Sequence, residues 1–220
     1  GVMADRDPLV DGYDRLAAAY ADRLWTELDD KPIDRWLLER VAREAVGPVL
    51  DVGCGPGHVT AFLAAHGADA RGLDLAPGMV EVARARSPGL AFQVGDLRAL
   101  PYPDATLGAV VAAYSLIHVP RDQLVAAVAE LARVLRPGGL LLASVHAGSE
   151  TLRPAELWGI PIAIDWNFVE PEVLFGAAEA AGLVPLERLV RWPYPTEHPS
   201  RRCTLLAARP RDEGPGRSVG

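Results

Sequence analysis

Hydrophobic residues are spaced along this chain in two ways that alternate, and the two spacings predict strands and helices in turn. Continuous apolar stretches are typical of strands buried on both faces of a parallel sheet. Such stretches predict five strands, at 49–52, 70–75, 91–94, 107–114 and 140–145. Because helical spacing recurs between them, the pattern is that of βαβ units and predicts an α/β fold with a doubly wound, mostly parallel sheet.

The remaining elements follow from helical spacing and its breakers. The first 45 residues are expected to be helical up to Gly47-Pro48, and 121–135 is expected to be an amphipathic helix. Pro137-Gly138-Gly139 should end that helix, because proline and glycine are poor helix residues. A further helix at 171–181 and two strands at 184–191 and 203–209 complete a seven-stranded sheet.

Two segments interrupt this rhythm, 147–168 and 192–202. Both follow late strands, so we expect them to lie over the carboxyl edge of the sheet, where ligands bind in such folds, and to form a substrate lid. One domain is expected over 11–209, with an N-terminal helical part at 1–46. The polar tail at 210–220, rich in glycine and proline, is expected to be disordered.

The composition narrows the class of protein. Half of the 220 residues are hydrophobic and 23% are charged, which is ordinary for a globular domain and excludes a collagen or a disulfide scaffold. Two cysteines and no zinc-type spacing favour a reducing cytoplasm and no metal. The net charge of -7 disfavours a nucleic-acid partner. No apolar run reaches the ~20 residues of a membrane span, and the first residues show no signal-peptide pattern.

A glycine-rich turn follows the first strand, in the stretch VLDVGCGPGH at 49–58. Glycines at 53, 55 and 57 allow a sharp turn and a close approach of the backbone to a ligand, and the helix start beyond offers free N–H groups. A dinucleotide-binding loop would need glycine at 58, where His58 stands. The turn therefore favours a ligand other than a dinucleotide.

Acidic residues follow the next two strands. Asp74 ends the second strand, 17 residues after Gly57, and Asp96 follows the third. A carboxylate at the first position can accept hydrogen bonds from both hydroxyls of a ribose. One adenosine-like ligand lying across the strand ends would meet all three loops.

Four motifs in this order carry a family resemblance: VLDVGCGPGHVT at 49–60, GLDLAPGMVEVAR at 72–84, GDLRALPYPDATLGAVVAAYSLIHVP at 95–120 and LARVLRPGGLLLASVH at 131–146. With the helical YDRLAAAYAD near the front, the chain resembles a class I S-adenosylmethionine-dependent methyltransferase of the methyltransferase type 11 kind. The resemblance covers most of 12–146. It implies a Rossmann-like sheet, S-adenosylmethionine as cofactor and S-adenosylhomocysteine as product.

The resemblance also implies roles for single residues. Asp74 would hold the ribose hydroxyls, Asp96 would accept from the adenine amine, and Asp51 would hold the amino group of the cofactor. The glycines would line its methionine part, and Tyr20 would close over it. The whole expected cofactor-binding set is Tyr20, Asp51, Gly53, Cys54, Gly55, Gly57, Asp74, Leu75, Met79, Asp96, Leu97, Ala113 and Tyr114.

Two histidines are candidates for catalysis. His118 follows the fourth strand and His146 ends the fifth, so both are expected near the transferred methyl group. Either can act as a general base, and either can serve in packing or a structural hydrogen bond instead.

Aromatic and basic residues in the irregular segments are candidates for the acceptor site. Trp158, Trp166 and Phe168 would form an apolar lid over a substrate, or the small core that orders a long loop. Arg201 lies in a local basic group, which either recognises a carboxylate or phosphate or is a solvated strand end.

The sequence thus predicts methyl transfer to an oxygen or nitrogen of a small organic acceptor. The residues after the fourth strand, Ala113-Tyr114-Ser115-Leu116, differ from the Asn/Asp-Pro-Pro of methyltransferases that act on base or glutamine amines. Two alternatives remain: a non-catalytic protein that binds S-adenosylmethionine, and a nucleotide- or NAD-binding oxidoreductase, which His58 disfavours.

Overall fold

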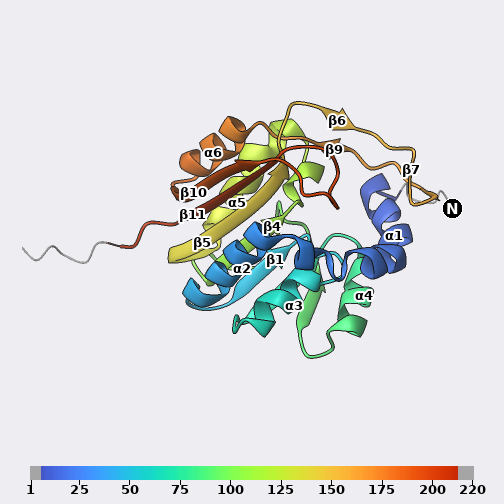
Figure 1. Ribbon diagram of the computed structural model, residues 1–220. Helices are drawn as coiled ribbons and strands as arrows, with labels where there is room; N and C mark the ends of the chain where they lie inside the picture. The colour runs from blue at the N-terminus through green and yellow to red at the C-terminus, as the bar shows by residue number, and fades with distance from the viewer. Residues whose placement is uncertain (1–5, 213–220) are drawn as a thin grey trace, which may run out of the picture.

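A seven-stranded sheet forms the centre of the protein, whose computed structural model describes residues 6–212 (Figure 1). Residues 213–220 of the expected disordered tail lie outside the described residues. The strand order is β10-β11-β5-β4-β1-β2-β3, and β11 runs against its neighbours. This confirms the doubly wound, mostly parallel sheet. The strands are β1 (Val49–Val52), β2 (Ala70–Asp74), β3 (Ala91–Val94), β4 (Leu107–Ala113), β5 (Leu135–His146), β10 (Val184–Arg191) and β11 (Arg202–Ala208).

Helices cover both faces of this sheet (Figure 1). Those on one face, α5 and α6, pack on β5, β10 and β11, and α2 and α3 lie on the other face. Proline stands in the first turn of α1, α2, α4 and α6, where its missing N–H has no helical partner to lose. The helices are α1 (Pro8–Leu24), α2 (Pro32–Glu44), α3 (His58–Ala65), α4 (Pro77–Arg86), α5 (Leu124–Arg133) and α6 (Pro171–Ala180), with short 3₁₀ turns at Glu27–Asp30, Leu116–His118 and Arg121–Gln123.

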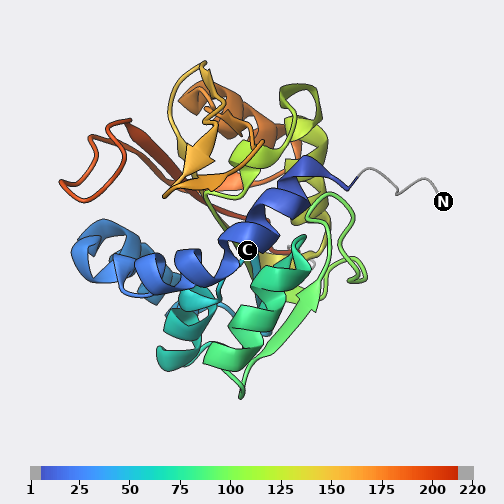
Figure 2. The same cartoon turned by 90° about the vertical axis from the view of Figure 1, so that its right-hand side faces the viewer.

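The two central strands explain why the carboxyl edge is well fixed. Every residue of β1 is buried, and β4 is buried as far as Ala112, as the continuous apolar runs predict. Since β1, β2, β3, β4 and β5 are parallel, the loops that follow them meet at one edge of the sheet. The α1 helix lies across that edge and packs against α4 (Figure 2).

The prediction for 121–135 and its end is wrong in one respect. The segment begins as a 3₁₀ turn and is α-helical only over Leu124–Arg133, and β5 starts at Leu135. Pro137-Gly138-Gly139 thus lies inside a strand instead of ending the helix. The pairing of β4 with β5 shifts register there, and a Cβ on Gly139 would lie 2.8 Å from the Arg136 carbonyl oxygen. A bulge of this kind accommodates residues that a regular ladder would exclude.

The segment 147–168 forms two short two-stranded ribbons above the strand ends (Figures 1 and 2). They pair β6 (Thr151–Leu152) with β9 (Trp166–Asn167) and β7 (Glu156–Leu157) with β8 (Ile160–Pro161). The Arg121 guanidinium donates hydrogen bonds to the carbonyl oxygens of Phe168, Ser149 and Glu150, which anchors the segment. The 147–168 segment is therefore held to the rest of the fold by these hydrogen bonds, and its role as a lid stays a prediction.

Candidate active site

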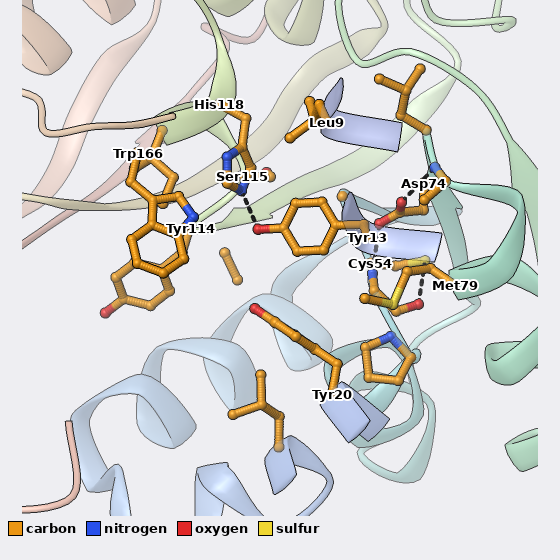
Figure 3. A pocket seen from close by; sticks show the side chains of 18 of the residues that line it. Leu9, Tyr13, Tyr20, Cys54, Asp74, Met79, Tyr114, Ser115, His118 and Trp166 are labelled. Atoms are coloured by element: carbon orange, nitrogen blue, oxygen red, sulfur yellow. Dashed lines mark hydrogen bonds between the residues drawn. The ribbon is translucent and has the colours of Figure 1, made fainter. Parts of the chain in front are cut away.

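One large cavity opens at the carboxyl edge of the sheet, between the strand loops, α1 and the 147–168 segment (Figure 3). Its volume is about 920 Å³. That is near the upper end of the roughly 300–1,000 Å³ found for small-molecule sites, so the cavity offers room for more than one small ligand. No helix within residues 6–212 is long and apolar enough to cross a membrane, and no group of three potential metal-ligating side chains occurs in that range.

The glycine-rich turn forms the floor of this cavity. Gly53, Gly55 and Gly57 all have positive φ, at 67°, 53° and 84°. A Cβ on Gly53 would lie 2.3 Å from the Ser115 Cβ, so this glycine is required by packing. A Cβ on Gly55 would meet only the Tyr20 ring, at 3.9 Å, so that position leaves open space for a ligand.

Gly57 does not line the cavity. It precedes α3, and a Cβ there would lie 2.8 Å from the Phe92 ring on β3. Its conformation closes the turn and allows helix and strand to pack. Gly57 thus has a structural role in this geometry, and its predicted contact with the cofactor stays a prediction.

Asp74 holds the glycine turn from the end of β2. Its Oδ2 accepts from the Gly55 N–H at 2.8 Å, and its Oδ1 accepts from the Ala76 N–H at 2.9 Å (Figure 3). Burial raises the pKa of this carboxyl, and the two N–H donors oppose the rise. A carboxylate has about four lone-pair directions, so two remain for hydroxyl donors in the cavity.

Asp51 is the other buried acid of the cavity floor. Its Oδ2 accepts from the Thr60 hydroxyl at 2.7 Å, and burial raises its pKa to about 7. A buried carboxyl of this kind gains most from a nearby cation. Asp51 therefore fits the predicted partner, the ammonium group of S-adenosylmethionine.

Asp96 is placed differently from the other two acids. Arg98 bonds it through Nε and Nη2, at 3.1 and 2.8 Å, and the Arg98 N–H donates to it as well. Burial acts to raise its pKa, but the Arg98 hydrogen bonds outweigh burial and lower it. Asp96 lines the cavity beside Leu97, yet much of its accepting capacity is already used.

A tyrosine–histidine contact crosses the middle of the cavity. The Tyr13 hydroxyl lies 2.7 Å from His118 Nε2, and His118 Nδ1 lies 3.3 Å from the Asp165 carbonyl oxygen (Figure 3). A carbonyl only accepts, so Nδ1 carries the proton and Nε2 accepts from Tyr13. Burial lowers the pKa of His118 to about 4, against the effect of that carbonyl.

His146 and Arg202 lie side by side at the far end of the cavity. They are directly paired in the β5–β11 register, and both line the cavity with Tyr114. Arg202 Nη1 donates to the Ser200 Oγ at 2.6 Å, and that oxygen lies 2.7 Å from His146 Nδ1. The same oxygen lies 3.3 Å from His198 Nδ1, so the Ser200 hydroxyl has two histidine nitrogens to which it can donate. When it donates to His146 Nδ1, the His146 proton is on Nε2. Burial, and next the positive charge of Arg202, lower the pKa of His146 to about 3.

Buried ion pairs fix the segment that carries these groups. Glu197 lies 2.8 Å from Arg191 Nη2 and 2.8 Å from Arg202 Nε, although the second contact lacks hydrogen-bond alignment. Arg191 also pairs with Asp34 on α2, at 2.9 Å. These contacts hold the 192–202 segment against α2 and thus fix the far wall of the cavity.

A third polar group lies between α1 and the glycine turn. Glu27 pairs with His58 Nε2 at 2.5 Å and with Lys31 Nζ at 2.9 Å. Burial acts to raise the pKa of Glu27, but His58 and Lys31 outweigh it and bring the pKa to about 2. His58 Nδ1 is buried without a hydrogen-bond partner among the described residues.

Most residues predicted for the site line this one cavity. Gly57 and Arg201 are the exceptions among the predicted site residues, because Arg201 is exposed and its neighbour Arg202 lines the cavity instead. Burial raises the pKa of the Cys54 thiol, which agrees with the lack of a base partner for it. The predicted residues that do line it are Tyr20, Asp51, Gly53, Cys54, Gly55, Asp74, Leu75, Met79, Asp96, Leu97, Ala113, Tyr114, His118, His146, Trp158, Trp166 and Phe168.

Sequence reasoning gave no site role to the lining residues Tyr13 and Lys31, and it considered Arg202 only as a member of the local basic group around Arg201. A signal existed for Tyr13, which lies on the same helical face as Tyr20. For Lys31 no sequence pattern marks the site, because loop geometry brings it there.

The site residues fit S-adenosylmethionine on three structural grounds. Gly55 leaves open space, Asp74 keeps two accepting directions free, and Asp51 is a buried carboxyl suited to a cation. The Ser115 hydroxyl is also buried at the cavity without a partner among the described residues.

Comparison with known proteins agrees with this assignment. A family model described as a methyltransferase domain matches residues 49–139. The chain is 38% identical over 110 residues to a malonyl-[acyl-carrier protein] O-methyltransferase of Serratia marcescens, a match that covers 50% of this chain and 42% of that protein. It is 35% identical over 145 residues to a demethylmenaquinone methyltransferase of Beutenbergia cavernae, with 63% and 58% covered. The chain thus spans about half the length of the curated relatives it matches.

The fold is shared over a greater length. The structure of the CcbJ methyltransferase from Streptomyces caelestis superposes with a TM-score of 0.71 and 18% identity, covering 93% of this chain and 99% of that one. At this identity the likeness shows the fold. Residues 49–139 thus match a methyltransferase domain, and the chain around them has the fold of a Rossmann-like methyltransferase.

Proposed function

We propose that this protein transfers a methyl group from S-adenosylmethionine to an oxygen or nitrogen of a small organic acceptor by in-line displacement. The observation that carries the proposal is the large cavity of about 920 Å³. This cavity connects the floor that is suited to the cofactor, where Asp51 and Asp74 lie, to an aromatic chamber under the 147–168 segment. The relatives named above differ in the acceptors that their names state, so the acceptor must be inferred from this chain.

The protein's part in such a reaction is to bind, orient and exclude water. S-adenosylmethionine, when bound, supplies a methyl group that its sulfonium already activates. Asp74 and Asp51 would hold its ribose and its ammonium group, which fixes the direction of the transferred methyl group. Tyr13, Tyr20 and Trp158 cover the chamber, with Tyr20 and Trp158 ring centres 5.6 Å apart.

Tyr114 stands where β4 ends and has φ of 59°, a conformation that non-glycine residues rarely adopt. Such backbone strain is frequent at functional sites. We assign Ala113 and Tyr114, two residues of the cofactor-binding set that the family resemblance implies, to the border of the sulfonium and its methyl group. We place His118 and His146 at the acceptor side of the same chamber.

The test is a calorimetric titration of the full chain with S-adenosylhomocysteine, with NADH titrated in parallel by fluorescence. We expect saturable binding of the first ligand in the micromolar range and none of the second. Binding of NADH alone would support the oxidoreductase alternative and refute the proposal. Binding of S-adenosylhomocysteine without consumption of S-adenosylmethionine across acids, alcohols, phenols and amines would support the non-catalytic alternative.

A further inference from the structure

The acceptor end of the cavity holds hydrogen-bond donors that no described residue uses. Arg202 donates through Nη1 to Ser200 and His198 and lies beside Glu197 through Nε, which leaves its Nη2 without a partner. His146 bonds Ser200 through Nδ1, so its Nε2 has no partner among the described residues and is a donor when Ser200 donates to Nδ1. Both side chains line the cavity.

Tyr114 adds a third unused donor next to them. Its hydroxyl is buried and has no hydrogen-bond partner among the described residues. Its ring lies 5.6 Å from the Arg202 guanidinium, 5.7 Å from Lys31 Nζ and 5.3 Å from the His146 ring. Burial keeps the pKa of Tyr114 well above the usual value, so the hydroxyl stays protonated. A hydrogen-bond acceptor placed beside it would satisfy this buried donor.

The acids of this region are each paired with cations. Glu197 is paired with Arg191 and Arg202, and Glu27 with His58 and Lys31. Asp34, whose charge acts on Tyr114, is paired with Arg191. An incoming anion would therefore meet one partly free guanidinium and two neutral donors. Hydrogen bonds that involve an ionised group are about twice as strong as neutral ones.

Neither histidine is arranged as a strong base for the proton of an acceptor. His118 Nε2 accepts from Tyr13, and His146 Nδ1 is bonded to Ser200. The low pKa values of both side chains, about 4 and about 3, make them weak bases as well. An acceptor that has already lost its proton suits this chamber better than an alcohol or a phenol.

We propose that the acceptor is a carboxylic acid with an apolar body, bound as its carboxylate by Arg202, His146 and Tyr114 and methylated on a carboxylate oxygen. The apolar body would pack against Trp158, Trp166 and Phe168, which line the same chamber. The carboxylate oxygen forms a bond to the methyl carbon as the carbon–sulfur bond breaks, and the bonding pair leaves on sulfur. The products are a methyl ester and a neutral thioether, and no proton moves. This inference rests on the proposed function.

The first experiment measures binding without turnover. The full chain with S-adenosylhomocysteine is titrated with phenylacetate, hexanoate and cinnamate, and in parallel with the amides of the same acids, by following tryptophan fluorescence and by calorimetry. We expect saturable binding of at least one acid, with its amide at least about tenfold weaker, since the amide loses the charge-assisted bond. Equal binding of acid and amide, or no binding of any acid while S-adenosylhomocysteine binds, would overturn the inference.

The second experiment identifies the bond that forms. Methyl-labelled S-adenosylmethionine is incubated with the protein and the same acids, and the product is treated with mild alkali. A carboxylate methyl ester releases labelled methanol, whereas N-methyl and ether products retain their label. Retained label would overturn the carboxylate assignment and leave the proposed methyl transfer standing, whereas failure of S-adenosylhomocysteine to bind would refute the proposed function itself.

Variants test the residues that are assigned to the carboxylate. Arg202→Gln is expected to raise the Kd of the acid at least about tenfold and to leave that of S-adenosylhomocysteine within about twofold. Arg188→Gln is the control, because Arg188 pairs with Glu179 on the outer surface. If Arg202→Gln fails to fold, Tyr114→Phe removes a single hydroxyl without a partner and is expected to weaken acid binding in the same direction. Unchanged acid binding in Tyr114→Phe and in a folded Arg202→Gln would refute the assignment of these residues to the carboxylate.

Discussion

Replacing Asp74 by Asn separates the two tasks that the structure gives this carboxylate. Its oxygens accept from the backbone N–H groups of Gly55 and Ala76, and their remaining lone pairs face the cavity. Asn has one accepting oxygen, and its amide nitrogen only donates. In the variant, one backbone N–H would face a donor and the cofactor would lose at least one bond to a charged oxygen.

The size of both effects follows from ordinary hydrogen-bond energies. A bond to a charged group contributes about 1.5–3 kcal/mol, so the Kd of S-adenosylhomocysteine should rise roughly 10- to 150-fold. A buried N–H without a partner costs about 1–3 kcal/mol of folding free energy. The melting temperature should therefore fall by roughly 2–12 °C at this chain length, while the protein remains folded at room temperature.

The assay is calorimetric titration with S-adenosylhomocysteine at about pH 8, after thermal unfolding has confirmed a cooperative fold. Asp96→Asn is the matched control, because Arg98 already occupies much of that carboxylate and its side chain is 31% exposed. We expect Asp96→Asn to change Kd by less than about fivefold, the range typical of exposed charges. An equal loss in both variants, or a loss below about threefold for Asp74→Asn, would refute the ribose role of Asp74.

Further predictions concern pH, the glycine turn and the histidine that faces the acceptor. Burial raises the pKa of Asp51 from 3.8 to about 7, so the folded protein binds this proton more tightly than the unfolded chain, and the stability from this group is full below about pH 4 and lost as the pH rises to about 7. Asp51→Asn should therefore flatten the fall of the unfolding free energy with pH, measured by urea titration, and an unchanged pH dependence would contradict the assigned pKa. The Kd of S-adenosylmethionine should rise about tenfold per pH unit below about pH 7, because binding then has to displace the Asp51 proton. Gly57→Ala should lower stability by at least about 2 kcal/mol more than Gly67→Ala, because both glycines have positive φ but only the first would place a Cβ 2.8 Å from Phe92. Equal melting temperatures of the two variants would show that the Phe92 ring moves aside without cost. For a carboxylate acceptor, kcat should be constant between about pH 7.5 and 9, because His118 has a pKa of about 4 and acts on no proton; a kcat that rises across that range would indicate a general base.

The cofactor half of the site was predictable because it depends on local features. Parallel strands end at one edge, so Asp51, Asp74 and Asp96, which stand in or just after β1, β2 and β3, had to lie near one another. The glycine spacing fixed the turn between β1 and α3. These features need only the strand order and the residues next to each strand end.

Two details of that half depended on contacts that motif spacing does not show. Gly57 faces Phe92 on β3, 35 residues further along the chain, and Asp96 is bound by Arg98 within the same turn. Motif spacing identifies a residue type, whereas the direction in which the residue faces is set by the packing of α3 on β3 and by the turn after β3.

The acceptor half of the site was harder to predict from the sequence, because the side chains of a strand alternate between its two faces. From a basic group that also holds Arg202, sequence reasoning chose Arg201 as the substrate contact, and the structure places Arg202 in the cavity, one residue further along. Successive side chains of a strand point to opposite faces, so a difference of one residue exchanges the cavity for solvent. The choice is made by the pairing of Arg202 with His146, across 56 residues of sequence, in β11, the described strand that runs opposite to the rest of the sheet. Since β11 enters the sheet from the carboxyl edge, its first residue lies at the strand ends where the parallel strands finish, and this brings a guanidinium next to the end of β5. The same reversal that makes β11 exceptional in the fold therefore supplies the cation on which the acceptor proposal depends.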